Sequence, residues 1–225
     1  MRFLSLCVLL SSASLSAFGA ARAEGAPQTD EEKTIYALGQ IINRNLQPFA
    51  ITDAEMKIVM QGMSDAAHGI NVQTDLEQYE AKIKDLQRSR MGIAAAKEKE
   101  ASKGFLAKAA AEKGAKKTAS GLIITTTKAG TGDTPKPLDK VKVNYEGKLT
   151  DGTIFDSSIQ RGQPATFPLN GVIPCWTEGV QLMKVGGKSK LVCPADIAYG
   201  DRGSPPKIKP GATLVFDVEL LEIVK

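Results

Sequence analysis

The segment from residue 75 to residue 117 most constrains how this chain of 225 residues can fold. Its last part, AAAKEKEASKGFLAKAAAEKGAKK, is a mixture of Ala, Lys and Glu that favours helix but has no obvious apolar face. A continuous helix of roughly 40 residues would extend about 60 Å, which is far longer than one small domain needs. We expect a rod-like linker helix over residues 74–117, flexing near Gly104 and Gly114, with a domain on each side.

The first 23 residues differ in kind from the rest and predict a secretory signal peptide over residues 1–23. Arg2 is followed by an apolar stretch and by small residues, and Ala21-Arg22-Ala23 has the A-x-A pattern of a cleavage site. A membrane anchor is the alternative, but the run is short of the ~20 apolar residues that a spanning helix needs. We expect an exported protein without a membrane segment after cleavage. The periplasm is the location that we favour, and secretion or surface association are the alternatives.

The charge of the chain is mild. The formal charge is +4, and removal of Arg2 and Arg22 with the signal peptide leaves +2, which points to no nucleic-acid partner. The one histidine, His68, lies at the end of a predicted helix, where it suits the negative helix terminus, so we assign it no chemistry. We expect no metal and no cofactor.

Helical signals dominate the region before the linker. Thr-x-x-Glu capping boxes at Thr29, Thr52 and Thr74 predict the starts of three helices. The first two carry apolar residues at spacings of three and four: Ile35, Leu38, Ile42 and Leu46, then Met56, Val59, Met60, Met63 and Ala67. Two such short helices bury little surface alone. We therefore expect residues 24–73 to form a homodimerisation domain, with folding back on the second domain as the alternative.

Residues 118–225 change to turns and strands. Alternating apolar residues predict strands around Val141 to Tyr145, around Leu191 to Cys193 and, most clearly, from Leu214 to Leu220. Turn signals separate them at Asp151-Gly152, Gly186-Gly187 and the proline-rich stretch of residues 205–211. Only residues 176–183 have the spacing of a short helix. This half is predicted to be a sheet with one short helix.

Two cysteines, Cys175 and Cys193, remain after signal cleavage. An oxidising compartment allows them to pair, and we favour a disulfide. The alternative is two small buried hydrophobic residues. Two cysteines without a nearby histidine do not complete a tetrahedral zinc site.

Several separated motifs in this half resemble the FKBP-type peptidyl-prolyl cis-trans isomerases. They are VKVNYEGKLTDGTIFDSS, VIPCWTEGVQLMKVGG, AYGDRG and GATLVFDVELLEI, and the resemblance covers about residues 121–225. The helical region is similar to the dimerising N-terminal domain of exported FKBPs of the macrophage infectivity potentiator type. The resemblance implies an α+β fold, in which a bent antiparallel sheet is half-wrapped around a short helix with an aromatic pocket between them.

The resemblance also implies the site residues. Catalytic roles fall to Tyr145, Phe155, Asp156, Tyr199 and Phe216, and substrate-binding roles fall to Arg161, Phe167, Val172, Ile173, Trp176 and Ile208. Trp176 would be the pocket floor beneath the proline ring, and the Tyr199 hydroxyl would donate to the substrate backbone. Asp156 would join Tyr145 and Arg161 in a polar network. Taken singly, each aromatic residue is more often a core residue, but the set spans separate segments that share only this pocket in the family.

An apolar pocket suits this chemistry because no bond has to be broken. The X-Pro amide resists rotation by roughly 18 to 20 kcal/mol, since resonance gives its C–N bond partial double-bond character. A dry site disfavours the polar planar amide relative to the twisted one, so binding the twisted state is enough for catalysis. The expected partners are proline-containing unfolded or nascent exported proteins.

Two other functions stay open at this point. A dimeric chaperone would hold unfolded clients, with isomerisation secondary, and an inert adhesion module would use the fold alone. Three positions depart from the family pattern: Cys175 replaces a common glycine, Lys207 replaces an apolar flap residue and Gly171 replaces a polar rim residue. We therefore expect isomerase activity more firmly than tight binding of macrolide inhibitors.

Overall fold

The computed structural model describes residues 26–70 and 76–224. The expected signal peptide over residues 1–23 and the capping threonine Thr74 lie outside these ranges. The chain divides into two compact units between Ile42 and Asn43. Within the described ranges, no helix combines the length and apolar character needed to cross a membrane.

The first helix begins where its capping box predicts. Helix α1 spans Asp30–Leu46. The amide of Glu32 donates to Thr29 Oγ1 over 3.1 Å, and the Glu32 carboxylate accepts from the Thr29 amide over 3.0 Å. This exchange satisfies two of the amides that have no partner within the helix. A short 3-10 helix, η1 (Gln47–Phe49), follows it, with a proline in its first turn.

Helix α2 spans Asp53–Ala67 and also begins at a complete capping box, formed by Thr52 and Glu55. His68 is its C-terminal cap, and a ring nitrogen of His68 lies 2.7 Å from the carbonyl oxygen of Ser64. Both predicted helix starts in the described residues are therefore confirmed, and His68 occupies the helix end that we expected.

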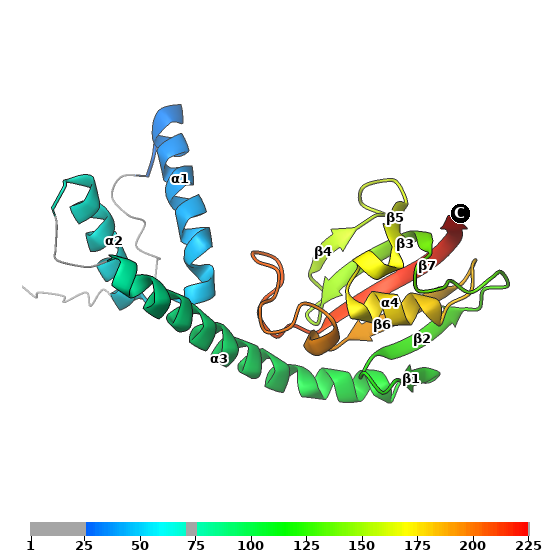
Figure 1. The fold of residues 1–225 in the computed structure, drawn as a ribbon. Coiled ribbons are helices and arrows are strands. Elements are labelled where there is room, and N and C mark those ends of the chain that lie inside the picture. The colour runs from blue at the N-terminus through cyan, green and yellow to red at the C-terminus, as the bar shows by residue number, and fades with distance from the viewer. Residues whose placement is uncertain (1–25, 71–75, 225) are drawn as a thin grey trace, which may run out of the picture. The chain divides into compact units, whose positions relative to one another are not determined.

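Helix α3 spans Leu76–Ala110 and passes through Gly104 without a break (Figure 1). It ends at Ala110, before the position that we expected, and Gly114 in the turn that follows adopts a left-handed φ of 81°, which suits glycine. Residues Ala115–Lys117 then form a strand, β1, instead of further helix. The prediction of helix up to residue 117 is wrong for this last part.

The second half of α3 also has a buried face that its composition did not indicate. Ala109 is buried in a cluster with Ile123, Val192 and Val215 of the sheet, and Phe105 and Leu106 pack against that cluster. The expectation of a helix without a core face is therefore wrong near its C-terminal end. This end of the helix covers one face of the sheet.

Seven antiparallel strands form one sheet in the order β1-β2-β6-β7-β3-β4, and β5 pairs with β3 (Figure 1). Beyond β1, their bounds are β2 Ile123–Lys128, β3 Lys140–Leu149, β4 Ile154–Ser157, β5 Ala165–Pro168, β6 Lys188–Cys193 and β7 Leu214–Val224. The alternating patterns located β3, β6 and β7. The α+β fold that the resemblance implied is confirmed.

The other face of the sheet packs against the short helix α4, which spans Pro174–Gln181. Alternation assigns successive residues of a strand to opposite faces. Leu214 and Phe216 of β7 accordingly belong to the core with α4, while Val215 belongs to the cluster beneath α3. The main core thus lies between α4 and the sheet, and the cavity described below opens beside it.

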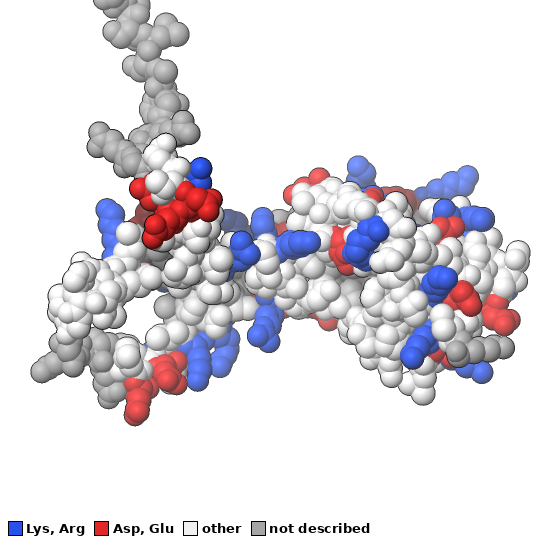
Figure 2. All heavy atoms as spheres, turned by 90° about the horizontal axis from the view of Figure 1, so that it is seen from above, with Lys and Arg blue, Asp and Glu red and all other residues white. Residues whose placement is uncertain are grey.

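Lys and Arg as well as Asp and Glu are scattered over the face seen in Figure 2, with no large area of a single charge. Oppositely charged side chains of the described residues form ion pairs, such as Lys190 with Glu112 over 2.9 Å and Lys188 with Glu219 over 3.2 Å. The mixture agrees with the small formal charge of +4.

Candidate active site

A cavity of about 460 Å³ lies at one edge of the main core. Its lining residues are Tyr145, Phe155, Asp156, Phe167, Gly171, Val172, Ile173, Trp176, Tyr199 and Phe216. They come from strands β3, β4, β5 and β7, from the short 3-10 helix η2 (Leu169–Gly171), from α4 and from the loops beside α4 and β6. The structure therefore brings most of the expected site residues around one cavity, although their sequence positions are far apart.

Trp176 lies at the centre of an aromatic cluster. Its ring centroid is 5.1 Å from that of Tyr145, 5.4 Å from that of Phe216 and 5.7 Å from that of Phe167, with interplanar angles of 90°, 86° and 86° respectively. Edge-to-face packing of this kind is the favoured arrangement of aromatic rings. Trp176 is only 4% exposed, and its indole Nε1 has no hydrogen-bond partner within the described residues. The cluster gives the cavity an apolar and closely packed floor.

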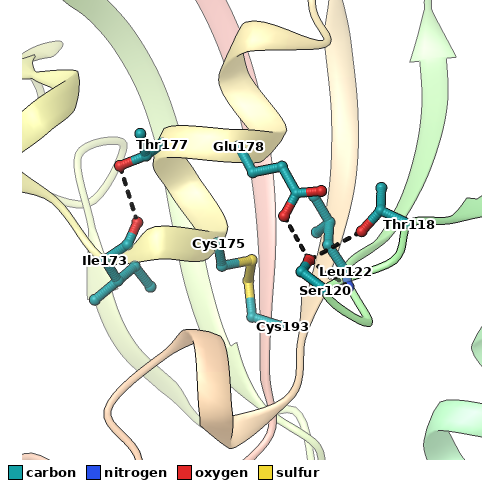
Figure 3. The surroundings of a disulfide bond; sticks show 8 residues. All are labelled: Thr118, Ser120, Leu122, Ile173, Cys175, Thr177, Glu178 and Cys193. Atoms are coloured by element: carbon teal, nitrogen blue, oxygen red, sulfur yellow. Dashed lines mark hydrogen bonds between the residues drawn. A yellow bond between two sulfur atoms is a disulfide. The ribbon is translucent and has the colours of Figure 1, made fainter. Parts of the chain in front are cut away.

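The disulfide between Cys175 and Cys193 fixes the helix that carries Trp176 (Figure 3). It joins the first turn of α4 to the last residue of β6, with the two Cα atoms 5.8 Å apart. Both cysteines are fully buried. The favoured pairing is thus confirmed, and the neighbour of the floor residue is bonded covalently to the sheet.

Hydrogen bonds hold α4 from two further directions, as Figure 3 shows in part. The Thr177 hydroxyl donates to the carbonyl oxygen of Leu169 over 2.6 Å. On the next residue, the Glu178 carboxylate accepts from the Ser120 hydroxyl. Together with the disulfide, these bonds tie α4 to three separate segments of the strand-rich half.

Gly147 of β3 makes room for two aromatic walls of the cavity. A Cβ atom at this position would lie 2.7 Å from Phe155 Cζ and 2.9 Å from Phe216 Cε1, closer than real side chains come. The two rings meet edge to face with centroids 5.6 Å apart. The sequence reasoning did not single out Gly147, although a glycine inside a predicted strand can mark such a close approach.

Tyr145, Asp156 and Arg161 form a polar cluster at the edge of the cavity. The Tyr145 hydroxyl donates to Asp156 Oδ2, and the Arg161 guanidinium donates both to Asp156 Oδ1 and, over 2.8 Å, to the Tyr145 hydroxyl oxygen. Arg161 does not line the cavity and contacts its edge through these bonds and through the Tyr145 ring, whose centroid is 5.5 Å from Arg161 Cζ. The polar network that the resemblance implied is present.

The cluster keeps Asp156 ionised. Burial alone would raise the pKa of Asp156, but hydrogen bonds from Tyr145 and Arg161 outweigh it, and the pKa lies below its usual value. Burial, together with the bond to Asp156, raises the pKa of Tyr145. At neutral pH the group is therefore a carboxylate beside a neutral phenol. A carboxylate with donors on both oxygens is suited to fixing the Tyr145 ring, and not to moving protons.

Tyr199 and Ile208 differ in their access to the cavity. Tyr199 lines it, is 39% exposed, and has no hydrogen bond from its hydroxyl within residues 26–70 and 76–224. Ile208, which the resemblance placed on a wall, does not line the cavity and is buried in the main core. Paired backbone bonds between Ser204 and Ile208, of 2.8 and 3.0 Å, hold it there. Ile208 belongs to the same core cluster as the cavity residues Tyr145, Trp176 and Phe216, and its role in substrate binding stays a prediction.

Lys207, beside Ile208, reaches back to the site. Its ammonium donates to the carbonyl oxygen of Phe155 over 2.8 Å. The cation therefore ties the 204–210 loop to β4, at the position where the resemblance implied an apolar side chain.

A sheet packed on one short helix, with an aromatic cavity between them, defines the fold of a proline isomerase of the FKBP class. Residues 132–221 match the family model described as FKBP-type peptidyl-prolyl cis-trans isomerase, and residues 31–124 match that of the domain amino terminal to FKBP-type peptidyl-prolyl isomerase. The chain belongs to the FKBP-type peptidyl-prolyl cis-trans isomerases. It is an enzyme, and the identification from its motifs is confirmed.

Relatives match across most of the chain. It is 44% identical to the FKBP-type peptidyl-prolyl cis-trans isomerase FkpA of Aeromonas hydrophila, covering 87% of this chain and 77% of that protein. It is 34% identical to the peptidyl-prolyl cis-trans isomerase Mip of Coxiella burnetii, covering 88% and 89% respectively. The crystal structure of FkpA from Escherichia coli superposes with a TM-score of 0.63 at 39% identity, over 88% of this chain and 98% of that chain. The likeness therefore extends over both the helical and the strand-rich regions.

Proposed function

We propose that this isomerase acts without a covalent intermediate, by binding a twisted X-Pro amide in the aromatic cavity. The observation that supports this is the set of rings packed edge to face around Trp176, which offers an apolar floor to a proline ring. An amide leaving water for such a site loses part of the stabilisation of its polar planar form. The twisted form carries less charge on its carbonyl oxygen, so it is bound better than either planar isomer.

The residues divide the work in this proposal. The proline ring lies on Trp176, and Tyr145, Phe155 and Phe216 close the sides. Tyr199 is 39% exposed, and its hydroxyl has no hydrogen-bond partner among the described residues, so it is assigned to orienting the substrate backbone. Asp156 stays charged and holds the Tyr145 ring in place.

Isomerisation of a short hydrophobic-X-Pro peptide tests this assignment, with the chain from residue 24 onward. Tyr199→Phe should lower kcat/KM by removing one hydrogen bond, worth about 0.5 to 1.5 kcal/mol or roughly two- to tenfold. Trp176→Leu should retain folding and reduce turnover further. Unchanged turnover in Trp176→Leu would mean that Trp176 serves only the core. Unchanged turnover in Tyr199→Phe would remove Tyr199 from the mechanism.

We further propose that residues 24–73 form a dimerisation domain, joined by the linker over residues 74–117 to the isomerase domain over residues 118–225. Helix α1 exposes Ile35, Leu38 and Ile41, which are 62%, 56% and 51% exposed, and α2 exposes Ile58 and Met60. Exposed apolar patches of this kind mark interaction sites. A second copy would cover both sets of patches in a symmetric way.

Sedimentation decides the assembly. The chain from residue 24 should have twice the monomer mass, and Leu38→Glu should make it a monomer. Gln40→Glu introduces the same charge at another exposed position of α1 and should leave the dimer intact. A monomeric parent chain at micromolar concentration would contradict the dimer, while the isomerase assignment would remain.

A second function, holding unfolded clients, is favoured by the same exposed apolar side chains. The clients would be proline-containing exported proteins, met in the periplasm. The leader-like residues 1–23 and the disulfide, which needs an oxidising compartment, support that location. If holding is separate from turnover, Tyr199→Phe should still suppress aggregation of an unfolded client, and Leu38→Glu should suppress it less while isomerising peptides normally. Equal loss of both activities in either variant would contradict a separate holding function.

A further inference from the structure

Lys99 of α3 contacts the loop that carries Tyr199, although it lies far from that loop in sequence. Tyr199 follows the 3-10 helix η3, which spans Ala195–Ile197. The Lys99 ammonium lies 2.6 Å from Asp196 Oδ1 and 2.7 Å from Asp201 Oδ1. One cation therefore joins carboxylates on both sides of Tyr199. We propose that Lys99 is a positioning residue for Tyr199 in the isomerase reaction, an inference that rests on the proposed role of Tyr199.

A second contact comes from the preceding turn of the same helix. Ala95 is 1% exposed and packs against Gly211, where a Cβ atom would lie 2.4 Å from the Ala95 carbonyl oxygen. The Gly211 amide donates to the carbonyl oxygen of Gly200, the residue after Tyr199, over 3.0 Å. Since residues four apart lie on one face of a helix, Ala95 and Lys99 present one surface to this loop. The helix thus holds the loop by packing as well as by charge.

The loop has backbone hydrogen bonds of its own, but they do not hold the Tyr199 side chain. The Gly200 amide donates to the Ala195 carbonyl oxygen over 2.8 Å, and the Gly203 amide donates to that of Tyr199 over 3.0 Å. These bonds set the turn, whereas the Tyr199 hydroxyl makes no hydrogen bond with any other residue that the structure describes. The position of the Tyr199 hydroxyl therefore depends on the position of the loop backbone.

The ion pairs of Lys99 with Asp196 and Asp201 are better suited to fixing the position of the loop than to stabilising the whole fold. The Lys99 side chain is 35% exposed, and those of Asp196 and Asp201 are 75% and 62% exposed. Exposed pairs contribute little to global stability and are screened by salt. Without the cation, the two carboxylates would repel each other across Tyr199. Small displacements of an orienting group are costly in catalysis, with about 1 Å sufficient for a 10²-fold loss.

This arrangement connects the helical region to the active site. Lys99 lies within the match to the amino-terminal family model, over residues 31–124, and outside the match to the isomerase model, over residues 132–221. The reaction would then depend on a residue that the isomerase region alone does not contain.

The test compares kcat and KM for a short hydrophobic-X-Pro peptide in the chain from residue 24, with Lys99→Gln as the variant. We expect kcat/KM to fall about three- to tenfold, less than the loss for a full 1 Å displacement, with an unchanged midpoint of unfolding. Lys99→Arg keeps the charge and should restore activity. Lys103→Gln is the matched control, since Lys103 pairs with Glu100 of its own helix.

Salt dependence distinguishes positioning by charge from a structural role. Salt should lower kcat/KM of the parent chain towards that of Lys99→Gln and leave the variant unchanged. If Lys99→Gln matches the parent chain while Tyr199→Phe is impaired, the role of Lys99 is wrong and the proposed site stands. If Tyr199→Phe also has the activity of the parent chain, the role proposed for Tyr199 is wrong, and so is the role of Lys99, which rests on it. Loss of activity with an equal salt response in parent and variant would likewise overturn positioning by charge.

Discussion

Removal of the disulfide between Cys175 and Cys193 should destabilise the protein by a predictable amount. The two residues are separated by 18 positions. Closing a loop of that size lowers the entropy of the unfolded chain and stabilises the native state by about 3 kcal/mol. The corresponding fall in Tm is roughly 10 °C for a domain of this size. Because the disulfide adjoins Trp176, we also expect its loss to loosen the cavity floor.

The assay is urea unfolding of the chain from residue 24, followed by the fluorescence of Trp176, the one tryptophan in the sequence. The oxidised protein should be about 3 kcal/mol more stable than the same protein in reductant. Cys175→Ala/Cys193→Ala should not respond to reductant, because that chain has no other cysteine. It should be less stable than the reduced parent, since two buried sulfur atoms are lost. A response to reductant below about 1 kcal/mol would refute the loop-closure reasoning.

Two further predictions follow from packing and from charge. Gly147→Ala should destabilise the protein by about 1 to 3 kcal/mol and lower kcat/KM in the peptide assay, because its methyl group would displace the Phe155 ring. Unchanged stability and unchanged kcat/KM would contradict this, because they would mean that the Phe155 ring accommodates the methyl group. Glu55 pairs with Arg90. The pKa of the Glu55 carboxyl is lowered from 4.5 to about 2, mainly by the hydrogen bond from Arg90 and, to a smaller extent, by the bond from the Thr52 backbone amide. The stabilising effect of this pair should be complete above pH 4.5 and disappear as the pH falls towards 2. Stability measured against pH should therefore differ between Glu55→Gln and the parent chain at pH 6 and converge near pH 2; a constant difference would contradict the pairing.

Local chemistry made much of this protein predictable from its sequence. The capping boxes at Thr29 and Thr52 satisfy helix amides within four residues, so they can be read without knowledge of the fold. Strands β3 and β7 follow from alternation, because one face is buried along their length. The site residues came from the order of several motifs, since no single aromatic residue distinguishes a pocket from a core.

Tertiary structure decided the features that depend on residues distant in sequence. The end of α3 at Ala110, its buried contacts and the strand that follows it arise from packing on the sheet, which its Ala-, Lys- and Glu-rich composition does not reveal. The two cysteines could have stayed separate, and only the 5.8 Å between their Cα atoms makes the bond possible. The backbone pairing of Ile208 with Ser204 likewise appears only in the folded chain. The contact of Lys99 with both sides of Tyr199 likewise has no signature in sequence, since nearly one hundred residues separate the partners and only the packing of α3 brings them together.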